Sequence, residues 1–222
     1  MLKLLVFDLD GTLVDTQRDL GNAVRHALIQ SGNPSLPLEA VMANVGDGAY
    51  LLIERSLKAA QNGRTPDPAE VETSLAAFLE YYSNHCLVES APYPGVSTAL
   101  EKLVGYRKAV LTNKPYEPSQ RILEGLGLAH HFEWIVGGDN PFGKKPNPAA
   151  LNHIVASAKV TAHQTLMIGD GVQDIRAARQ AGTRFLGFLN GIGNREALLA
   201  EQPEATIEEM RFVPEAMLDL EK

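Results

Sequence analysis

Residues 3–12 read KLLVFDLDGT, an apolar run that ends in two aspartates, a glycine and a threonine. A short apolar run bounded by turn residues is typical of a strand buried on both faces of a sheet. Side chains two residues apart on a strand point to the same side, so Asp8 and Asp10 are expected to face one spot beyond its carboxyl end. Gly11 permits a tight turn or a close approach to a ligand there. A plain surface turn is the alternative, because Asp-Gly is a common turn dipeptide.

The rest of the chain repeats this strand signal at regular intervals. Further apolar runs that predict strands lie at 108–112, 134–136, 165–169 and 184–189. Between them, the patterns predict helices near 95–104, 116–127, 148–159, 172–181 and 194–200. Gly127 and Gly182 fall where two of these helices should stop. Strands alternating with helices of this length predict βαβ units, and therefore an α/β fold with a parallel sheet.

Residues 16–85 interrupt that rhythm. They show helical patterns near 17–31, 48–61 and 68–85, without a convincing buried strand, and several prolines separate these patterns. The simplest interpretation is a small all-helical unit inserted after the first strand. We therefore expect a core of residues 1–15 and 86–222 and a helical domain of residues 16–85.

The composition limits the classes of partner. The 222 residues are 45% hydrophobic and 21% charged, as in globular proteins, with a formal net charge of −7. That charge argues against nucleic acid or an anionic membrane as the main partner, although a local basic pocket can still bind a small anion. Cys86 is the single cysteine, which excludes an intrachain disulfide and a cysteine-rich zinc site. Because no apolar run is long enough for a membrane span or a signal peptide, we expect a cytoplasmic protein. We also expect it to be a monomer or a weak homo-oligomer.

Two more carboxylates follow the run at 165–169. Asp170 falls at the end of that predicted strand, and Asp174 lies about one helical turn later on the same face of the next helix. The alternative is that Asp170 caps the helix and that Asp174 sits in its first turn, where negative charge is favoured.

Two polar stretches offer groups that suit an anion. Thr112, Asn113 and Lys114 follow a predicted strand, and a hydroxyl, an amide and exposed backbone donors at a strand end can bind an anion. Lys144 and Lys145 precede a helix that Pro148 opens. The alternative for the first stretch, taken by itself, is an ordinary loop. The alternative for the two lysines is that they are solvated surface residues.

Taken in their order along the chain (8–12, 112–114, 144–148 and 169–174), the four signals resemble the motifs of the haloacid dehalogenase superfamily of phosphohydrolases. The resemblance covers nearly the whole chain and implies a Rossmann-like, doubly wound parallel sheet with a helical cap domain inserted after the first strand. Within the superfamily, the chain is similar to the phosphoglycolate phosphatases. The similarity rests on Asn44–Ala49 and Thr112–Pro115, and on the stretches at 137–139 and 144–148. Gly171 departs from the pattern, because many members have serine there.

The resemblance also implies a role for each candidate residue. Asp8 would be the nucleophile that forms an aspartyl-phosphate, and Asp10 would be the general acid and base. Asp8, Asp170 and the backbone carbonyl of Asp10 would bind Mg²⁺. Asp174 would hold Lys145 or a metal-bound water. The groups that bind the phosphate would be Thr112, Asn113 and Lys145. Such charge neutralisation and in-line positioning are what a carboxylate needs in order to attack a phosphate.

The cap is then expected to select the leaving group. Gly46, Asp47 and Gly48 would form a turn between cap helices whose backbone N–H groups approach a bound anion, and an ordinary interhelical turn is the alternative. The expected substrate is a small phosphorylated acid, with 2-phosphoglycolate first. The alternatives are another small phosphorylated metabolite, pyrophosphate, or the reaction of a phosphosugar mutase of the same superfamily. A haloacid dehalogenase would have no use for Asp10 or for magnesium.

Overall fold

Six parallel strands form one sheet in the computed structural model, which describes residues 1–221. The five predicted strands are β1 (Leu4–Phe7), β4 (Arg107–Leu111), β5 (Trp134–Val136), β6 (Thr165–Gly169) and β7 (Arg184–Phe188). A sixth strand that the sequence did not predict, β8 (Ala205–Ile207), pairs with β7 at one edge. The order is β5-β4-β1-β6-β7-β8, so the first strand lies in the middle of the sheet. This is the strand order of the doubly wound dinucleotide-binding folds, and it confirms the predicted fold class.

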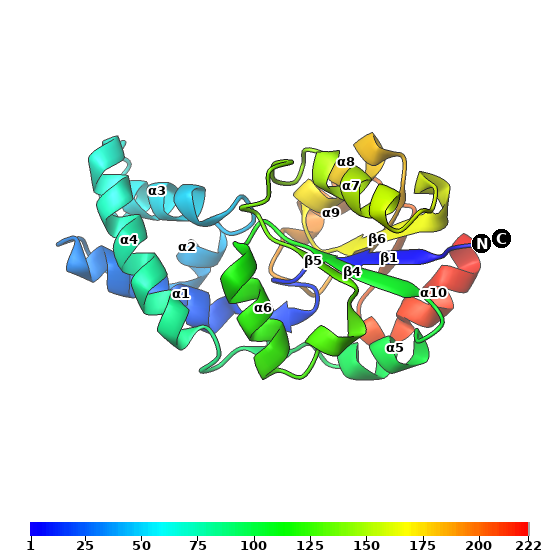
Figure 1. Cartoon of the computed structure of the whole chain (residues 1–222). Helices are drawn as coiled ribbons and strands as arrows, with labels where there is room; N and C mark the ends of the chain where they lie inside the picture. The colour runs from blue at the N-terminus through cyan, green and yellow to red at the C-terminus, as the bar shows by residue number, and fades with distance from the viewer. Residues whose placement is uncertain (222) are drawn as a thin grey trace. The chain divides into compact units, whose positions relative to one another are not determined.

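Helices cover both faces of this sheet (Figure 1). On one face lie α7 (Ala149–Ser157), α8 (Val172–Ala181) and α9 (Arg195–Ala200), and on the other α5 (Val96–Lys102), α6 (Tyr116–Gly125) and α10 (Val213–Leu220). Their apolar sides bury the strands: Leu4 and Val6 pack with Leu151, Ile154 and Ile175 in one core cluster. The helix α10 was not predicted, and α8 ends at Gly182, which is in the left-handed conformation that the predicted helix stop requires.

The chain divides into two compact units. One comprises Met1–Asp15 and the chain from Ala91 onward, and the other is Thr16–Ser90. The second unit contains α1 (Gln17–Gln30), α2 (Leu38–Met42), α3 (Ala49–Ala60) and α4 (Pro68–His85), of which only the five-residue α2 was not predicted. A short antiparallel pair, β2 (Val14–Asp15) with β3 (Ala91–Pro92), joins the two segments of the first unit at the point of insertion. None of the helices in the described part of the chain is long and apolar enough to cross a membrane.

Candidate active site

The carboxyl ends of the three central strands bring the predicted site residues together. Asp8 follows β1, Thr112 follows β4 and Asp170 follows β6, and β1 pairs with both neighbours. The chain runs from β1 through β4 to β5 at one edge of the sheet and from β6 through β7 to β8 at the other, so β1 and β6 flank the point where the strand order reverses. Ligands of doubly wound sheets bind at such a point. Residues that are more than a hundred positions apart in the sequence thereby share one edge of the sheet.

Lys145 lies at the centre of the cluster. Its Nζ is 2.7 Å from Oδ1 of Asp8 and 2.6 Å from Oδ1 of Asp174, and the lysine side chain is 2% exposed. Burying an ammonium group is costly unless carboxylates compensate it, and here two of them do. Asp174 also accepts the backbone N–H of Gly171 at 3.0 Å, so the same carboxylate holds the first turn of α8 and orients Lys145. Gly171 therefore contributes a backbone donor at the position where the superfamily pattern often has serine.

Asp170 is held from two sides. Its Oδ1 accepts the hydroxyl of Thr12 at 2.8 Å, and its Oδ2 accepts the backbone N–H of Gly193 at 2.7 Å. Gly191 approaches so closely that a Cβ at this position would lie 2.4 Å from Oδ2 of Asp170. The sequence analysis did not identify Thr12, Gly191 or Gly193. The sequence feature that could have indicated the two glycines is their place just after the apolar run at 184–189.

Crowded carboxylates and burial shift the acid–base behaviour of the cluster. Burial, followed by the negative charge of Asp174, raises the pKa of Asp8 to about 8, although Lys145 opposes the shift. The same two causes raise the pKa of Asp170 to about 6, against the hydrogen bonds from Gly193 and Thr12. Burial by itself would lower the pKa of Lys145, but Asp174 and Asp8 outweigh it and hold that pKa above its ordinary value. The site therefore has more carboxylate charge than its lysine compensates.

The donor set fits a hard divalent cation. One carboxylate oxygen from each of Asp8, Asp170 and Asp174 lies within 4.8 Å of the others. Carboxylate oxygens are the ligands that Mg²⁺ prefers, and a cation among them would relieve the repulsion that raises the two pKa values. The carboxylate of Asp10 is not a member of this group; that Asp10 offers its backbone carbonyl to the metal stays a prediction.

The loop after β4 is tied to Lys145. The side-chain amide of Asn113 donates to the carbonyl of Lys145 at 2.9 Å, and its Oδ1 accepts the backbone N–H of Lys145 at 2.8 Å. This double hydrogen bond was not predicted, because the sequence analysis considered the amide and backbone N–H of Asn113 only as groups that bind an anion. Thr112 accepts the backbone N–H of Lys114 at 3.2 Å, which leaves the hydroxyl proton of Thr112 available for another acceptor. All four residues are buried.

Asp10 has a partner to which the sequence analysis gave no role. Nζ of Lys114 lies 2.6 Å and 2.8 Å from the two carboxylate oxygens of Asp10. The Lys114 side chain is 5% exposed and that of Asp10 is 15% exposed. The signal for this pair was the lysine itself, which directly follows Thr112 and Asn113, but its partner is 104 residues away in the sequence.

The predicted substrate-selecting turn lies in the helical unit. Gly46 and Gly48 both have positive φ angles, and Gly48 is the N-cap residue that precedes α3. Oδ2 of Asp47 is 2.6 Å from Nη2 of Arg55, which lies two turns into the same helix. The φ angles of Gly46 and Gly48 are ones that other residues rarely adopt, which favours glycine at both positions of this turn.

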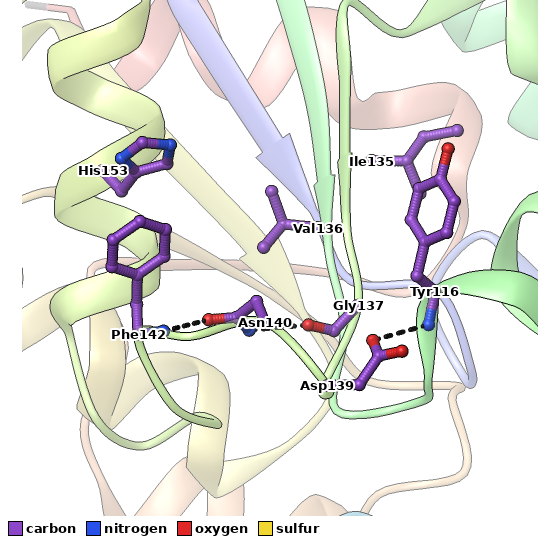
Figure 2. A pocket seen from close by; sticks show the side chains of 8 residues that line it. All are labelled: Tyr116, Ile135, Val136, Gly137, Asp139, Asn140, Phe142 and His153. Atoms are coloured by element: carbon purple, nitrogen blue, oxygen red, sulfur yellow. Dashed lines mark hydrogen bonds between the residues drawn. The ribbon is translucent and has the colours of Figure 1, made fainter.

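A separate cavity of about 310 Å³ lies beyond the end of β5, within the α/β unit (Figure 2). The ring of Phe142 stacks on His153 at a centroid distance of 4.1 Å on one side of it, and Tyr116 stands on the other side. Asp139 accepts the backbone N–H of Tyr116 at 2.8 Å and thereby holds the start of α6. None of the predicted site residues lines this cavity.

The comparisons with known proteins agree on one family. A family model described as haloacid dehalogenase-like hydrolase matches residues 5–188. A phosphoglycolate phosphatase of Pseudomonas putida is 38% identical over 212 residues, which are 94% of this chain and 77% of that protein. A phosphoglycolate phosphatase of Aliivibrio fischeri is 36% identical over 217 residues, covering 96% of this chain and 95% of that protein. The crystal structure of a predicted phosphoglycolate phosphatase from Haemophilus somnus has a TM-score of 0.92 at 31% identity and covers 97% of this chain and 98% of its own.

Proposed function

Because this chain belongs to the haloacid dehalogenase-like hydrolase family, we propose that it is a Mg²⁺-dependent phosphomonoesterase that hydrolyses 2-phosphoglycolate to glycolate and phosphate. The observation that carries the proposal is the cluster of Asp8, Asp170, Asp174 and Lys145 at the carboxyl edge of the sheet. The substrate name rests on relatives called phosphoglycolate phosphatases that are 36–38% identical to this chain over almost its full length.

In the first half of the reaction, Oδ of Asp8 attacks phosphorus, and the Asp8–phosphorus bond forms as the bond to the ester oxygen breaks. Asp10 gives its proton to the leaving alkoxide. Lys145, the hydroxyl of Thr112 and the backbone N–H of Asn113 stabilise the charge on the phosphoryl oxygens. Asp8, Asp170 and the carbonyl of Asp10 would hold a Mg²⁺ ion, which would supply further charge neutralisation when bound.

In the second half, Asp10 takes a proton from the attacking water, and the aspartyl-phosphate is cleaved to free Asp8 and inorganic phosphate. Asp174 keeps Lys145 in place throughout, since it is one of the two carboxylates paired with that ammonium group. The same residues serve both halves, because the acid of the first half becomes the base of the second.

These groups recognise only phosphate, so the helical unit must select the leaving group as a cap. We propose that Gly46, Asp47 and Gly48 form the selecting turn, whose glycines leave backbone N–H groups accessible to a small anionic substrate. Replacing Gly48 by Val should lower kcat/KM for 2-phosphoglycolate more than for an aryl phosphate, because valine strains a backbone of positive φ.

A panel of phosphate esters, assayed for phosphate release with and without Mg²⁺, tests the proposal. We expect kcat/KM for 2-phosphoglycolate to exceed that for glucose 6-phosphate at least about tenfold, or ~1.4 kcal/mol of differential binding. Full activity in EDTA would exclude the metal-dependent mechanism. Pyrophosphate or a hexose phosphate at the top of the panel would replace the substrate, and transfer of phosphate to a second sugar hydroxyl would identify a mutase.

The nucleophile has its own control. Asp8→Asn keeps the shape of the side chain but removes the attacking oxygen's charge, so turnover should fall below about a thousandth of the wild-type value. Losses of 10²–10⁴-fold are typical of general acid–base effects alone, and a smaller loss would assign the nucleophile elsewhere. A phosphate label on a peptide without Asp8 would do the same.

A further inference from the structure

Two buried lysines enter the site, and each pairs with different carboxylates. Lys145 lies between Asp8 and Asp174, whereas Lys114 spans both oxygens of Asp10. From this division we infer that Lys114 is a positioning residue: it holds the carboxyl group of Asp10 in the orientation needed for proton transfer. The inference rests on the proposed function, because it assigns the group that orients the general acid and base of that reaction.

The backbone of Lys114 is itself held on both sides. Its N–H donates to Oγ1 of Thr112 at 3.2 Å, and its carbonyl accepts the N–H of Gly138 at 2.7 Å. The ordering of this flexible side chain, which costs about 1.5–2 kcal/mol of rotamer entropy, is thus assisted by a rigid attachment point. Lys114 therefore links Asp10, on the loop after β1, to the loop after β4.

The backbone next to Asp10 forms a tight turn. Gly11 follows directly with a positive φ angle, and its N–H donates to the carbonyl of Val14. These contacts fix the backbone of the turn, and the contacts of Lys114 with both carboxylate oxygens constrain the side-chain torsions of Asp10. A misplacement of about 1 Å in a reacting group can cost about 100-fold in rate.

An ammonium group suits this task in both halves of the reaction. Lys114 has three donors, and a carboxyl group keeps an oxygen that can accept a hydrogen bond whether or not its other oxygen carries the proton. Lys114 can therefore stay bonded while Asp10 gives up a proton and takes one from water. The carboxylate of Asp10 also lies outside the cluster of Asp8, Asp170 and Asp174, so the two lysines act on different parts of the site.

The test compares Lys114→Met with wild type in rapid-mixing and steady-state assays. With 4-nitrophenyl phosphate, whose leaving group departs without a proton, the burst of nitrophenolate reports attack by Asp8, and the steady state reports cleavage by water. We expect the burst rate to stay within about fivefold and the steady-state rate to fall about 100-fold, because only cleavage needs Asp10. For an alkyl phosphate that the wild type hydrolyses, kcat should fall about 100-fold while KM stays within about threefold.

A double-mutant comparison separates positioning from other roles. Lys114→Met combined with Asp10→Asn should be no slower than Asp10→Asn alone, because the lysine acts through that carboxylate. Lys114→Gln, which keeps a donor without the charge, should recover part of the kcat. Lys144→Met, at an exposed neighbouring lysine, is the matched control and should leave both phases unchanged. If Lys114→Met does not fold, as judged by its melting curve, Lys114→Gln alone should still show the selective loss of the steady-state rate.

Three results would overturn the inference. A raised KM with unchanged kcat would make Lys114 a substrate-binding group, an equal loss in burst and steady state would make it a general structural residue, and wild-type rates would give it no role. Failure of the proposed function has a different signature, because the wild-type protein would then release no phosphate from any ester in the presence of Mg²⁺.

Discussion

Three carboxylates cluster at the carboxyl edge of the sheet, and two of them pair with one lysine. Asp8 and Asp174 contact Lys145 directly, whereas Asp170 is held by Thr12 and Gly193. Because burial and mutual repulsion raise the pKa of Asp8 and of Asp170, the site without a metal retains protons that a bound cation would displace. The burial and mutual repulsion of these carboxylates should make the stability of the metal-free protein depend on pH.

Asp8→Asn is expected to stabilise the protein in EDTA, and increasingly so as the pH rises. In the folded state the pKa of Asp8 is raised from 3.8 to about 8, so folding favours the protonated form. The stability that this proton confers is complete below the unfolded pKa and is lost as the pH rises through the folded one, whereas asparagine does not titrate. Between pH 5 and pH 8 (about the limits of this window), the melting temperature of the variant should gain at least about 3 °C on the wild type, or ~1 kcal/mol.

Mg²⁺ should reverse the order of stability of the wild type and Asp8→Asn. Added Mg²⁺ should raise the melting temperature of the wild type more than that of Asp8→Asn, because a ligand that binds the folded state more tightly stabilises it more at a given concentration. Thermal melts at matched ionic strength check both arms. A difference between the two proteins that does not change with pH would contradict the assignment of the raised pKa to Asp8.

At the scale of elements, the loop after β5 supports the loop after β4. The N–H of Gly138 donates to the carbonyl of Lys114, and a Cβ at Gly138 would lie 2.2 Å from the carbonyl oxygen of Asn113. Asn113 in turn holds the backbone of Lys145 through its amide group. The two loops and the segment of Lys145 thus form a continuous chain of contacts that sets the positions of both lysines.

Gly138→Ala should therefore lower activity through residues that it does not replace. The added methyl group meets backbone that cannot rotate away, so Asn113 must shift, and with it Lys145; we expect kcat/KM to fall at least about tenfold. Gly105→Ala is the matched control, since a Cβ there meets no atom within 4 Å and its φ angle is not positive. Steady-state kinetics and melting curves of both variants provide the measurement, and equal kcat/KM values would refute the supporting role.

At the scale of the whole molecule, hydrogen bonds join the first helix of the inserted unit to its last residues. The carboxylate of Asp19, on α1, accepts the N–H groups of Val88, Glu89 and Ser90 and the hydroxyl of Ser90, at 2.7–3.1 Å. The beginning and end of the helical unit are therefore joined within that unit. The flanking segments of the α/β unit meet in the same way, as the β2–β3 pair. A unit whose ends lie close together can be inserted without disturbing its host.

Asp19→Ala should loosen the helical unit more than the sheet. It removes a buried acceptor and leaves several donors without it, which should cost about 3 kcal/mol. Amide hydrogen exchange should accelerate in α1 and α4, with little change in β1 and β6. Asp67→Ala, which removes an exposed N-terminal cap of α4, should cost only about 1 kcal/mol. Uniform acceleration in both units would show that they unfold together.

The sequence by itself determined most elements and the edge at which the site lies. Apolar runs ended by polar residues predict β1 and β4 to β7, because the interior of a parallel sheet requires apolar side chains on both faces. The predicted bounds of α4 and α8 match the structure at 68–85 and 172–181. Among the elements that were missed are α2, β2, β3, β8 and α10, which are at most eight residues long, so their local pattern is weak.

Tertiary structure decided which polar groups meet. The hydrogen bonds from Lys114 to Asp10, from Asn113 to Lys145 and from Gly193 to Asp170 join residues 104, 32 and 23 positions apart. Local sequence contains no record of such pairs, because they follow from the order in which strands assemble and from the loops that this order places side by side. The sequence thus determined the chemical groups of the site, whereas the strand order decided which lysine serves which carboxylate.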